Sequence, residues 1–519
     1  MGRQRKQKGV SSEGKRFEYL PKNRLRKEQL LHMETNEATQ RERYQEVEKS
    51  LMKLVEAIEA IEDGNLKELE QTIYQGVLEL GRHRLQGRLN QSGQIAAGKR
   101  VGECGHQQQV VDYRIKQILT LMGKVELKRA YYRCQAENEA AGENEDDKPP
   151  CSGRAPADHL WGVDQRRTTP GVQEAISYLC ARLTFEEAAE TFSRFLPLKM
   201  TARQAQNLME PVGKALAEEE EQELKALFAP AVHKHSTEHE QHEPRAFKSI
   251  ERLYIEMDGI MERVRRGLVE MEEKEKTRKG DVYREVKVGV IFEAERGRER
   301  SELAPEVWVD RPKDHSMRYV ARRTARGDFD QLLYGLACQS GLHHAKQIVI
   351  LGDGALWIWK QAEEHFPGAV QMVDLYHAQE HVWQVARAVY GPQTQAAELW
   401  AKEACDLLVH GHIEQLVAAI TALPTIAPEP GESRSVPEKA IDYFTTNAER
   451  MRYPTFRAQR MHVGSGIAEA ACKTVVATRL KRSGMRWTPA GLDALLPLRT
   501  CVLNRAYDDF WLDHHRLVA

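Results

Sequence analysis

The chain has 519 residues, enough for two to four domains. Its 76 Lys and Arg nearly balance its 77 Asp and Glu, so a nucleic-acid partner would have to be bound by local basic patches and not by global charge. The sequence has no apolar run of about 18 residues, no apolar signal segment, and eight scattered cysteines, which together exclude membrane-spanning and secreted classes and predict a cytoplasmic protein.

The first third of the chain is predicted to contain a basic arm, a helical region and a small hairpin. Residues 1–35 are rich in Lys and Arg and predict a disordered, phosphate-binding arm. Apolar residues at helical spacing predict helices within 36–98. In the range 99–160, alternation around a Met-Gly pair predicts a hairpin over residues 116–134, and an acidic stretch at 136–150 predicts a loop.

Two helices around Pro197 are predicted in the range 161–217, and their pattern is compatible with a helix-turn-helix. Thr201 is the expected N-cap of the second helix. Polar side chains early in that helix can reach base edges in a DNA major groove: Arg203, Gln204, Gln206 and Asn207. Helix pairs of this length are also common packing units, and this alternative stays open. A polar, histidine-bearing tract at 218–248 predicts a linker.

From residue 249 onward, β-branched runs predict strands, and helical patterns lie between the later ones. This order predicts a mixed α/β sheet, with residues 249–377 as the first part of a core. Residues 378–455 are predicted to be almost entirely helical, as an insertion, and 456–519 to complete the core. In that last segment Ser465 can cap a helix that carries Glu469 in its first turn.

Two of the predicted strands end in an Asp-Gly pair, at Asp258 and Asp353. Ligands collect at strand ends in an open α/β sheet, and the glycine allows a sharp turn. If the fold brought both aspartates and Glu469 together, their repulsion would require divalent cations, and oxygen ligands favour Mg²⁺ or Mn²⁺. Two such ions activate a water or a 3′-hydroxyl in phosphodiester displacement. A single Asp-Gly pair, however, is more often an ordinary turn.

Several blocks of the sequence resemble a known family. They are YIEMDGIMERV, REVKVGVIFE, VILGDGALWIW, VDLYHAQEHVW and the long block from Asn447 to Trp487. Together they look like the blocks of bacterial insertion-sequence transposases of the Kra group, which are similar to other DDE enzymes with an RNase H-like catalytic core. The resemblance covers about residues 100–505 and is densest in the last block, with its GSG, Glu and KRSGMRW elements.

The resemblance implies a multidomain α plus α/β fold. It has a helical N-terminal and helix-turn-helix region and an RNase H-like mixed-sheet core interrupted by an all-helical insertion. The implied activity is metal-dependent DNA cleavage at insertion-sequence ends, followed by strand transfer into target DNA with two Mg²⁺ or Mn²⁺ ions. A homodimer or larger assembly and a nucleoid-associated location in the cytoplasm are expected. The alternatives are a non-catalytic DNA-binding regulator and an RNase H-like nuclease without strand transfer.

The resemblance also implies roles for individual residues. Asp258, Asp353 and Glu469 would be the three acids and metal ligands, with their carboxylates within metal-bridging reach of one another. His377 ends an Asp-x-x-His motif and would position DNA or the scissile phosphate as a catalytic residue. The alternative for His377 is a half-buried histidine that closes a strand.

Two further groups of residues are candidates for binding zinc and DNA. Family members tend to show Cys-x-x-Cys pairs around the hairpin, whereas this chain offers lone candidates for Zn²⁺: Cys104, His106, Cys134 and Cys151. A basic cluster after Glu469 would contact phosphates, with a tryptophan stacked on an unpaired base: Arg479, Lys481, Arg482, Arg486 and Trp487. A charge run of this kind is otherwise a solvated face.

Overall fold

The computed structural model divides into two compact units, residues 1–169 and 170–519. It describes residues 45, 47–94, 100–101, 107–134, 153–164, 166–228, 249–265, 282–301, 304–464 and 466–514. The predicted basic arm, the acidic loop, most of the predicted linker and Ser465 lie outside these residues.

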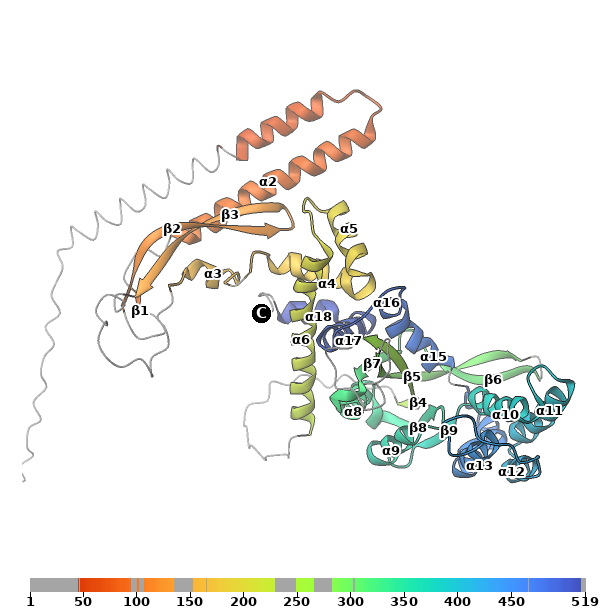
Figure 1. Ribbon diagram of the computed structural model, residues 1–519. Coiled ribbons are helices and arrows are strands. Elements are labelled where there is room, and N and C mark those ends of the chain that lie inside the picture. Colours follow the sequence, from red (N-terminus) through yellow and green to blue (C-terminus); the bar gives the residue numbers. More distant parts are fainter. Residues whose placement is uncertain are drawn as a thin grey trace, which may run out of the picture. The chain divides into compact units, whose positions relative to one another are not determined.

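The first unit combines a pair of helices with a small antiparallel sheet (Figure 1). A helix over residues 47–59 precedes α2 (Leu66–Gln94), and the sheet has the order β1-β2-β3. The strands are β1 (Arg100–Val101), β2 (Gln107–Thr120) and β3 (Gly123–Cys134), and α3 (Pro156–Leu160) follows. The second half of α2 packs on β3. The predicted hairpin is confirmed: β2 and β3 pair from Gln108↔Cys134 to Thr120↔Gly123.

The second unit begins with three helices, α4 (Pro170–Arg182), α5 (Phe185–Phe195) and α6 (Ala202–Leu227). Thr201 is the N-cap of α6, as predicted, and forms a reciprocal capping box with Gln204. The helix then continues ten residues into the range 218–248 that the sequence analysis assigns to a linker. The helix continues because the extension carries an apolar side chain, Leu224, which is buried beside α8 (Phe329–Gln339).

Gly213 marks the closest approach of α6 to α17 (Pro489–Leu503). A Cβ atom at this position would lie 1.8 Å from the backbone oxygen of Ala494. Only glycine therefore allows the two helices to pack at this distance.

Replacing Gly213 with alanine is expected to destabilise the second unit by about 1–3 kcal/mol, because the two helix backbones would have to move apart. Urea unfolding of the full-length protein measures this. Gly466→Ala is the matched control, since a Cβ there meets nothing within 4 Å. Equal stability of the two variants would contradict the expectation.

The second unit is built on a six-stranded mixed sheet with the order β6-β5-β4-β8-β9, and β7 pairs with β5. Strands β4, β8 and β9 are parallel to one another, whereas β5 is antiparallel to its neighbours. The predicted mixed sheet is confirmed, with two further strands, β6 and β7. The strands are β4 (Ile250–Val264), β5 (Val282–Ser301), β6 (Ala304–Pro312), β7 (Arg318–Arg323), β8 (Ala345–Gly352) and β9 (Val370–Val373).

Helices flank this sheet and follow it in the chain (Figure 1). Alongside β7 lie α8 and α17, and α9 connects β8 to β9. The region after β9 is helical up to α14, with a break at 423–435, as the sequence pattern predicts. The helices are α8 (Phe329–Gln339), α9 (Leu356–His365), α10 (Leu375–Tyr390), α11 (Gln395–Val409), α12 (Ile413–Thr421), α13 (Val436–Thr446), α14 (Tyr453–Ala458) and α18 (Tyr507–Asp513).

One continuous helical segment crosses the sheet before α17. It consists of α15 (Gly466–Ala471), the π-helical segment η6 (Cys472–Ala477) and α16 (Thr478–Leu480). Short 3₁₀ turns lie elsewhere: η3 (Thr324–Arg326), η4 (Leu342–His344) and η5 (Ala448–Met451). Among the described residues, no helix has the length and apolar character needed to cross a membrane.

Candidate active site

Asp258 and Asp353 lie side by side on adjacent parallel strands. The register of β4 and β8 ends with the pair Glu256↔Leu351, and each aspartate lies two residues beyond this pair in its own chain segment. Parallel strands are about 4.8 Å apart, so the two positions are neighbours. The negative charge of Asp353 contributes to raising the pKa of Asp258, which shows the same proximity in electrostatic terms.

The expectation that the first strand ends at Asp258 is wrong. β4 continues through Gly259 to Val264, and Gly259 pairs with Lys287 of β5. Antiparallel pairing with β5 therefore overrides the turn tendency of the Asp-Gly pair. Asp258 instead lies at the level where the neighbouring parallel strand β8 has already ended. Its side chain is therefore only half-buried, although β4 itself continues.

Asp353 does follow a strand end, as predicted. β8 ends at Gly352, and Gly354 turns the chain with a φ of 101°, in the left-handed region that favours glycine. The Asp353 carboxylate accepts a hydrogen bond from the Ala355 amide (2.9 Å), and its backbone oxygen accepts one from the Tyr443 hydroxyl (2.9 Å). Two bonds thus fix the conformation of this turn.

The carboxyl group of Asp258 is held by two donors. The Gly259 amide donates to its Oδ1 (2.7 Å), and the thiol of Cys472 in η6 also donates to it. Burial raises the pKa of Asp258 despite these bonds; Asp353 raises it further, and His377 lowers it. The site therefore places Asp258, Asp353 and His377 close together, with η6 packed against them.

Glu469 lies on α15, next to the turn of helix that carries Cys472, and contributes to the raised pKa of that thiol. Its carboxylate forms an ion pair with Lys473 (2.7 Å), in which the two side chains are 65% and 67% exposed. Within the described ranges, no three His, Cys, Asp or Glu side chains are arranged to hold a metal ion. The expected three-carboxylate cluster is thus not assembled in this conformation.

His377 lies in the first turn of α10, not at the end of a strand. Asp374 is the buried N-cap of this helix, and its carboxylate accepts from the His377 amide (2.9 Å). The imidazole is half-buried and packs edge-on against His381, with ring centroids 5.1 Å apart. The start of this helix therefore places His377 near Asp258.

Glu256, which was not predicted as a site residue, is fully buried on the same face of β4 as Asp258. Its Oε2 accepts from the Ala468 amide of α15 (2.9 Å), so it joins the strand of Asp258 to the helix of Glu469. Burial raises the pKa of Glu256 to about 8; the Ala468 bond lowers it and Asp374 raises it. The only signal in the sequence was its spacing of two residues from Asp258.

Glu256 is expected to make the stability of the metal-free protein depend on pH. The pKa of this carboxyl is 4.5 in the unfolded chain and about 8 in the folded protein. Between these two pH values unfolding releases a proton, so the free energy of unfolding falls as the pH rises. The slope should reach up to about 1.4 kcal/mol per pH unit. Urea unfolding in chelator at several pH values should show a flatter profile for Glu256→Gln. Glu251→Gln, at an exposed position of β4, should retain the slope.

The basic cluster after Glu469 divides into exposed and buried members. Lys481, Arg482 and Arg486 are exposed. Burial raises the pKa of Glu262 and of Cys472, and the charge of nearby Lys481 offsets part of each rise. Arg482 pairs with Glu187 of α5 (2.6 Å). Of these three cations, Lys481 is thus near Cys472, which contacts Asp258, whereas Arg482 is held against α5.

The prediction that Arg479 and Trp487 contact DNA is wrong for this conformation, because both side chains are buried. The Arg479 guanidinium donates to the Cys180 oxygen (2.8 Å) and lies over the rings of Phe185 and Trp487. The Trp487 indole donates to the Leu480 oxygen (3.1 Å). Both residues stabilise the packing of this segment on α4 and α5.

The candidate recognition helix presents part of its predicted polar set. Arg203, Gln204 and Asn207 are exposed near the start of α6, and Gln206 is half-buried. Gln204 completes the capping box, and Gln206 bonds to both Arg203 and Glu210. Their role in base contacts stays a prediction.

The zinc prediction falls mostly outside the described residues. Cys104, His106 and Cys151 are not among them, whereas Cys134 ends β3 and is buried. The candidate zinc site therefore stays a prediction.

Comparisons with known proteins give no family for the chain. No protein-family model matches it, and no curated protein matches it. Among solved structures, one similar chain is the Drosophila P element transposase strand transfer complex, at 10% sequence identity and a TM-score of 0.22, covering 69% of this chain and 84% of that one. At this level the similarity defines neither the family nor the activity of this chain. The fold and site define a multidomain protein with a mixed-sheet core and a pair of adjacent aspartates.

Proposed function

We propose that the chain is a DDE transposase, which cleaves DNA at the ends of an insertion sequence and joins the freed ends to target DNA. The observation that carries this proposal is the pair Asp258 and Asp353, which are neighbours because each lies two residues beyond the last paired position of the parallel strands β4 and β8. The resemblance of the sequence blocks to Kra-group transposases agrees with it. The mixed sheet is compatible with the RNase H-like core that the resemblance implies.

The donor set fits Mg²⁺ or Mn²⁺. Adjacent carboxylates repel each other, as the effect of Asp353 on the pKa of Asp258 shows, and a divalent cation would offset this repulsion. Glu469 would complete the ligand set once its side chain leaves Lys473. That exposed pair contributes only about 0.3–0.5 kcal/mol, so breaking it costs little.

The bound cations would activate the attacking oxygen and stabilise the leaving oxygen of the phosphodiester. The protein side chains would then hold the DNA in register with the metal site. His377, at the start of α10, would position the scissile phosphate, and Lys481, Arg482 and Arg486 would bind the phosphates on either side. Arg203, Gln204, Gln206 and Asn207 would contribute to recognition of the transposon ends.

A non-catalytic DNA-binding regulator is the main alternative. It would use the helices α4 to α6 for DNA binding, but it gives no reason for two adjacent aspartates in the sheet. An RNase H-like nuclease without strand transfer would share the same acids. Only an assay that detects joined products separates it from a transposase.

The test is a cleavage and joining assay with the full-length protein and DNA that carries the ends of its own element. We expect Mg²⁺ or Mn²⁺ to support both nicking at the 3′ ends and transfer of those ends into a target plasmid, and chelator to abolish both. Cleavage without joined products would favour the nuclease. Specific binding of the ends with neither reaction would overturn the proposal in favour of the regulator.

A further inference from the structure

The N-terminal unit contains a helical hairpin that presents two chemically different faces. It consists of the helix at 47–59 and the first part of α2, and we call it the N-terminal hairpin. The helices pack closely where Leu54 meets Gly76: a Cβ on Gly76 would lie 2.2 Å from the Leu54 Cδ1 atom. This contact marks the line along which the two helices touch, which we call the seam. The two faces of the hairpin lie on opposite sides of the seam.

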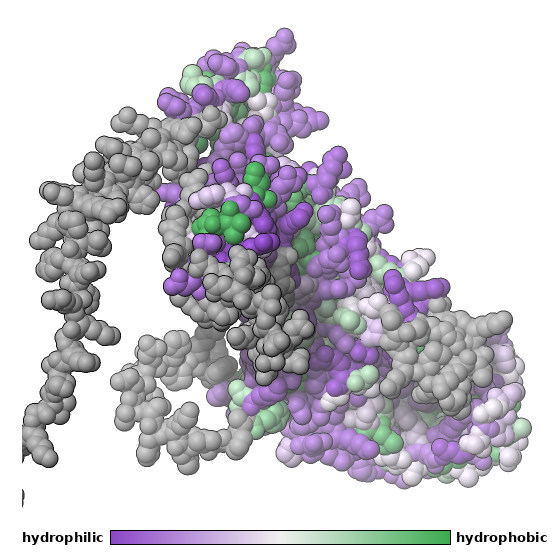
Figure 2. Space-filling view, turned by 60° about the vertical axis from the view of Figure 1, so that its left-hand side comes forward, coloured by the Kyte–Doolittle hydropathy of each residue, from purple (hydrophilic) through white to green (hydrophobic). Residues whose placement is uncertain are grey.

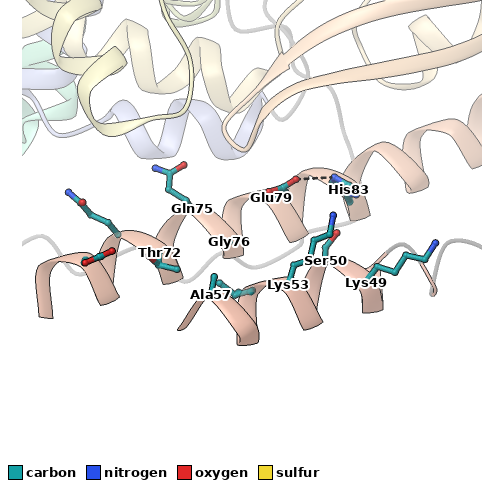
Figure 3. A pocket seen from close by; sticks show the side chains of 12 residues that line it. Lys49, Ser50, Lys53, Ala57, Thr72, Gln75, Gly76, Glu79 and His83 are labelled. Carbon is teal, nitrogen blue, oxygen red and sulfur yellow. Dashed lines mark ion pairs between the residues drawn. The ribbon is translucent and has the colours of Figure 1, made fainter. Parts of the chain in front are cut away.

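One face is a polar groove of about 490 Å³ along the seam (Figure 3). Figure 3 shows side chains from both helices around it, including the ion pair between Glu79 and His83. The polar lining residues are Lys49, Ser50, Lys53, Glu68, Gln71, Thr72, Gln75, Glu79 and His83. This face is suited to contact with water.

The other face is apolar and open to solvent. With about 100° between successive residues of a helix, five exposed apolar residues fall on the flank of the seam opposite the polar groove. In Figure 2 hydrophobic side chains reach the surface at the top of the view, where this hairpin lies. The five residues and their exposed fractions are Leu51 48%, Val55 38%, Leu66 65%, Ile73 40% and Val77 56%.

Charged residues at the two ends of this apolar face have opposite sign. Near the connection between the helices lie the exposed carboxylates of Glu59, Glu62 and Glu70. Arg84 and Arg88 are exposed at the opposite end, about 27 Å or more along α2 from its start. A second hairpin related by a twofold axis across the apolar face would bring each acidic end onto the basic end of its partner.

We propose that the apolar face of the N-terminal hairpin binds the same face of a second copy of this chain, in an antiparallel four-helix arrangement. Two helices alone cannot bury an apolar face on their outer side, whereas two copies cover it mutually and place opposite charges at both ends of the shared face. The polar groove stays in water on the outside of the assembly. This inference does not rest on the transposase proposal.

The test uses nucleic-acid-free, full-length protein in sedimentation velocity over a micromolar concentration range. Wild type is expected to be a dimer, and Val77→Glu, which places a charge on the apolar face, should weaken dimerisation about tenfold or more. Gln75→Glu makes the same change of charge on the polar groove and should dimerise as wild type does. Because all these positions are exposed or line an open groove, circular dichroism should show intact folding.

A charge reversal tests the antiparallel arrangement. Arg84→Glu with Arg88→Glu should weaken the dimer, and so should Glu59→Arg with Glu62→Arg. Mixing the two double variants should restore association, because each acidic end then meets a basic end. A monomeric wild type, equal weakening by Val77→Glu and Gln75→Glu, or a mixture that associates no better than either double variant alone would overturn the proposal.

Discussion

Replacing Asp258 with asparagine is expected to lower the rate of metal-dependent DNA cleavage by about 10³-fold or more, and Asp353→Asn should have the same effect. Asparagine keeps the shape and the hydrogen bond from the Gly259 amide but loses the negative charge that a divalent cation requires. Binding of transposon ends should stay within about twofold of wild type, because the proposed end-binding residues lie on α6. Single-turnover cleavage and a filter-binding assay measure the two effects separately.

Asp406→Asn is the matched control for these variants. Asp406 is an exposed aspartate in α11, and the substitution removes the same charge away from the two adjacent aspartates. It should leave cleavage unchanged. If Asp258→Asn cleaved DNA at the wild-type rate, the aspartate pair would not be the metal site, whatever the outcome for end binding.

Replacing Trp487 with alanine is expected to lower the free energy of unfolding of the second unit by about 3–5 kcal/mol, because it removes a buried aromatic side chain. The indole packs edge-on against Phe185 with ring centroids 5.9 Å apart, and its N–H donates to the Leu480 oxygen. Trp487→Phe should cost less, since it keeps most of the apolar volume. Urea unfolding followed by circular dichroism measures both variants.

Arg486→Ala separates a structural role of this segment from a DNA-binding role. Arg486 is exposed beside the buried Trp487, so its replacement should leave the free energy of unfolding within about 0.5 kcal/mol of wild type. Its affinity for DNA should fall, with a shallower dependence on salt. Wild-type stability of Trp487→Ala together with weaker stacking on single-stranded DNA would instead revive the original base-stacking prediction.

Much of the fold could be predicted from local sequence patterns. A few consecutive residues were enough to predict each of three features: the Thr201 cap, the β2-β3 hairpin and the strand that ends before Asp353. Strands β6 and β7 were missed because β6 begins and ends with proline-containing segments and β7 is a short run with three arginines. Both strands form because they pair with the 20-residue strand β5. Such pairing depends on residues distant in the sequence, so the local pattern does not reveal it.

The site was predictable at the aspartates and not at the residues around them. Arg479 lies ten positions after Glu469 and was expected to contact DNA because it belongs to the basic cluster there. The π-helical segment Cys472–Ala477 intervenes and changes the helical phase, which turns Arg479 into the interior. Glu256 and Cys472 act through contacts between β4 and the helix of Glu469, and no local pattern reveals such a contact.

The hydrogen bond from Tyr443 to the backbone of Asp353 has a consequence for attempts to shorten the protein. Tyr443 belongs to α13, in the helical region after β9, and its ring also packs against Gly354 in the turn that presents Asp353. Excising residues 378–455 to obtain a smaller catalytic core would therefore remove the hydrogen bond and the ring contact that hold the turn at Asp353 in place. In any chimera or shortened variant, the helical region and the sheet would have to be kept together or redesigned together.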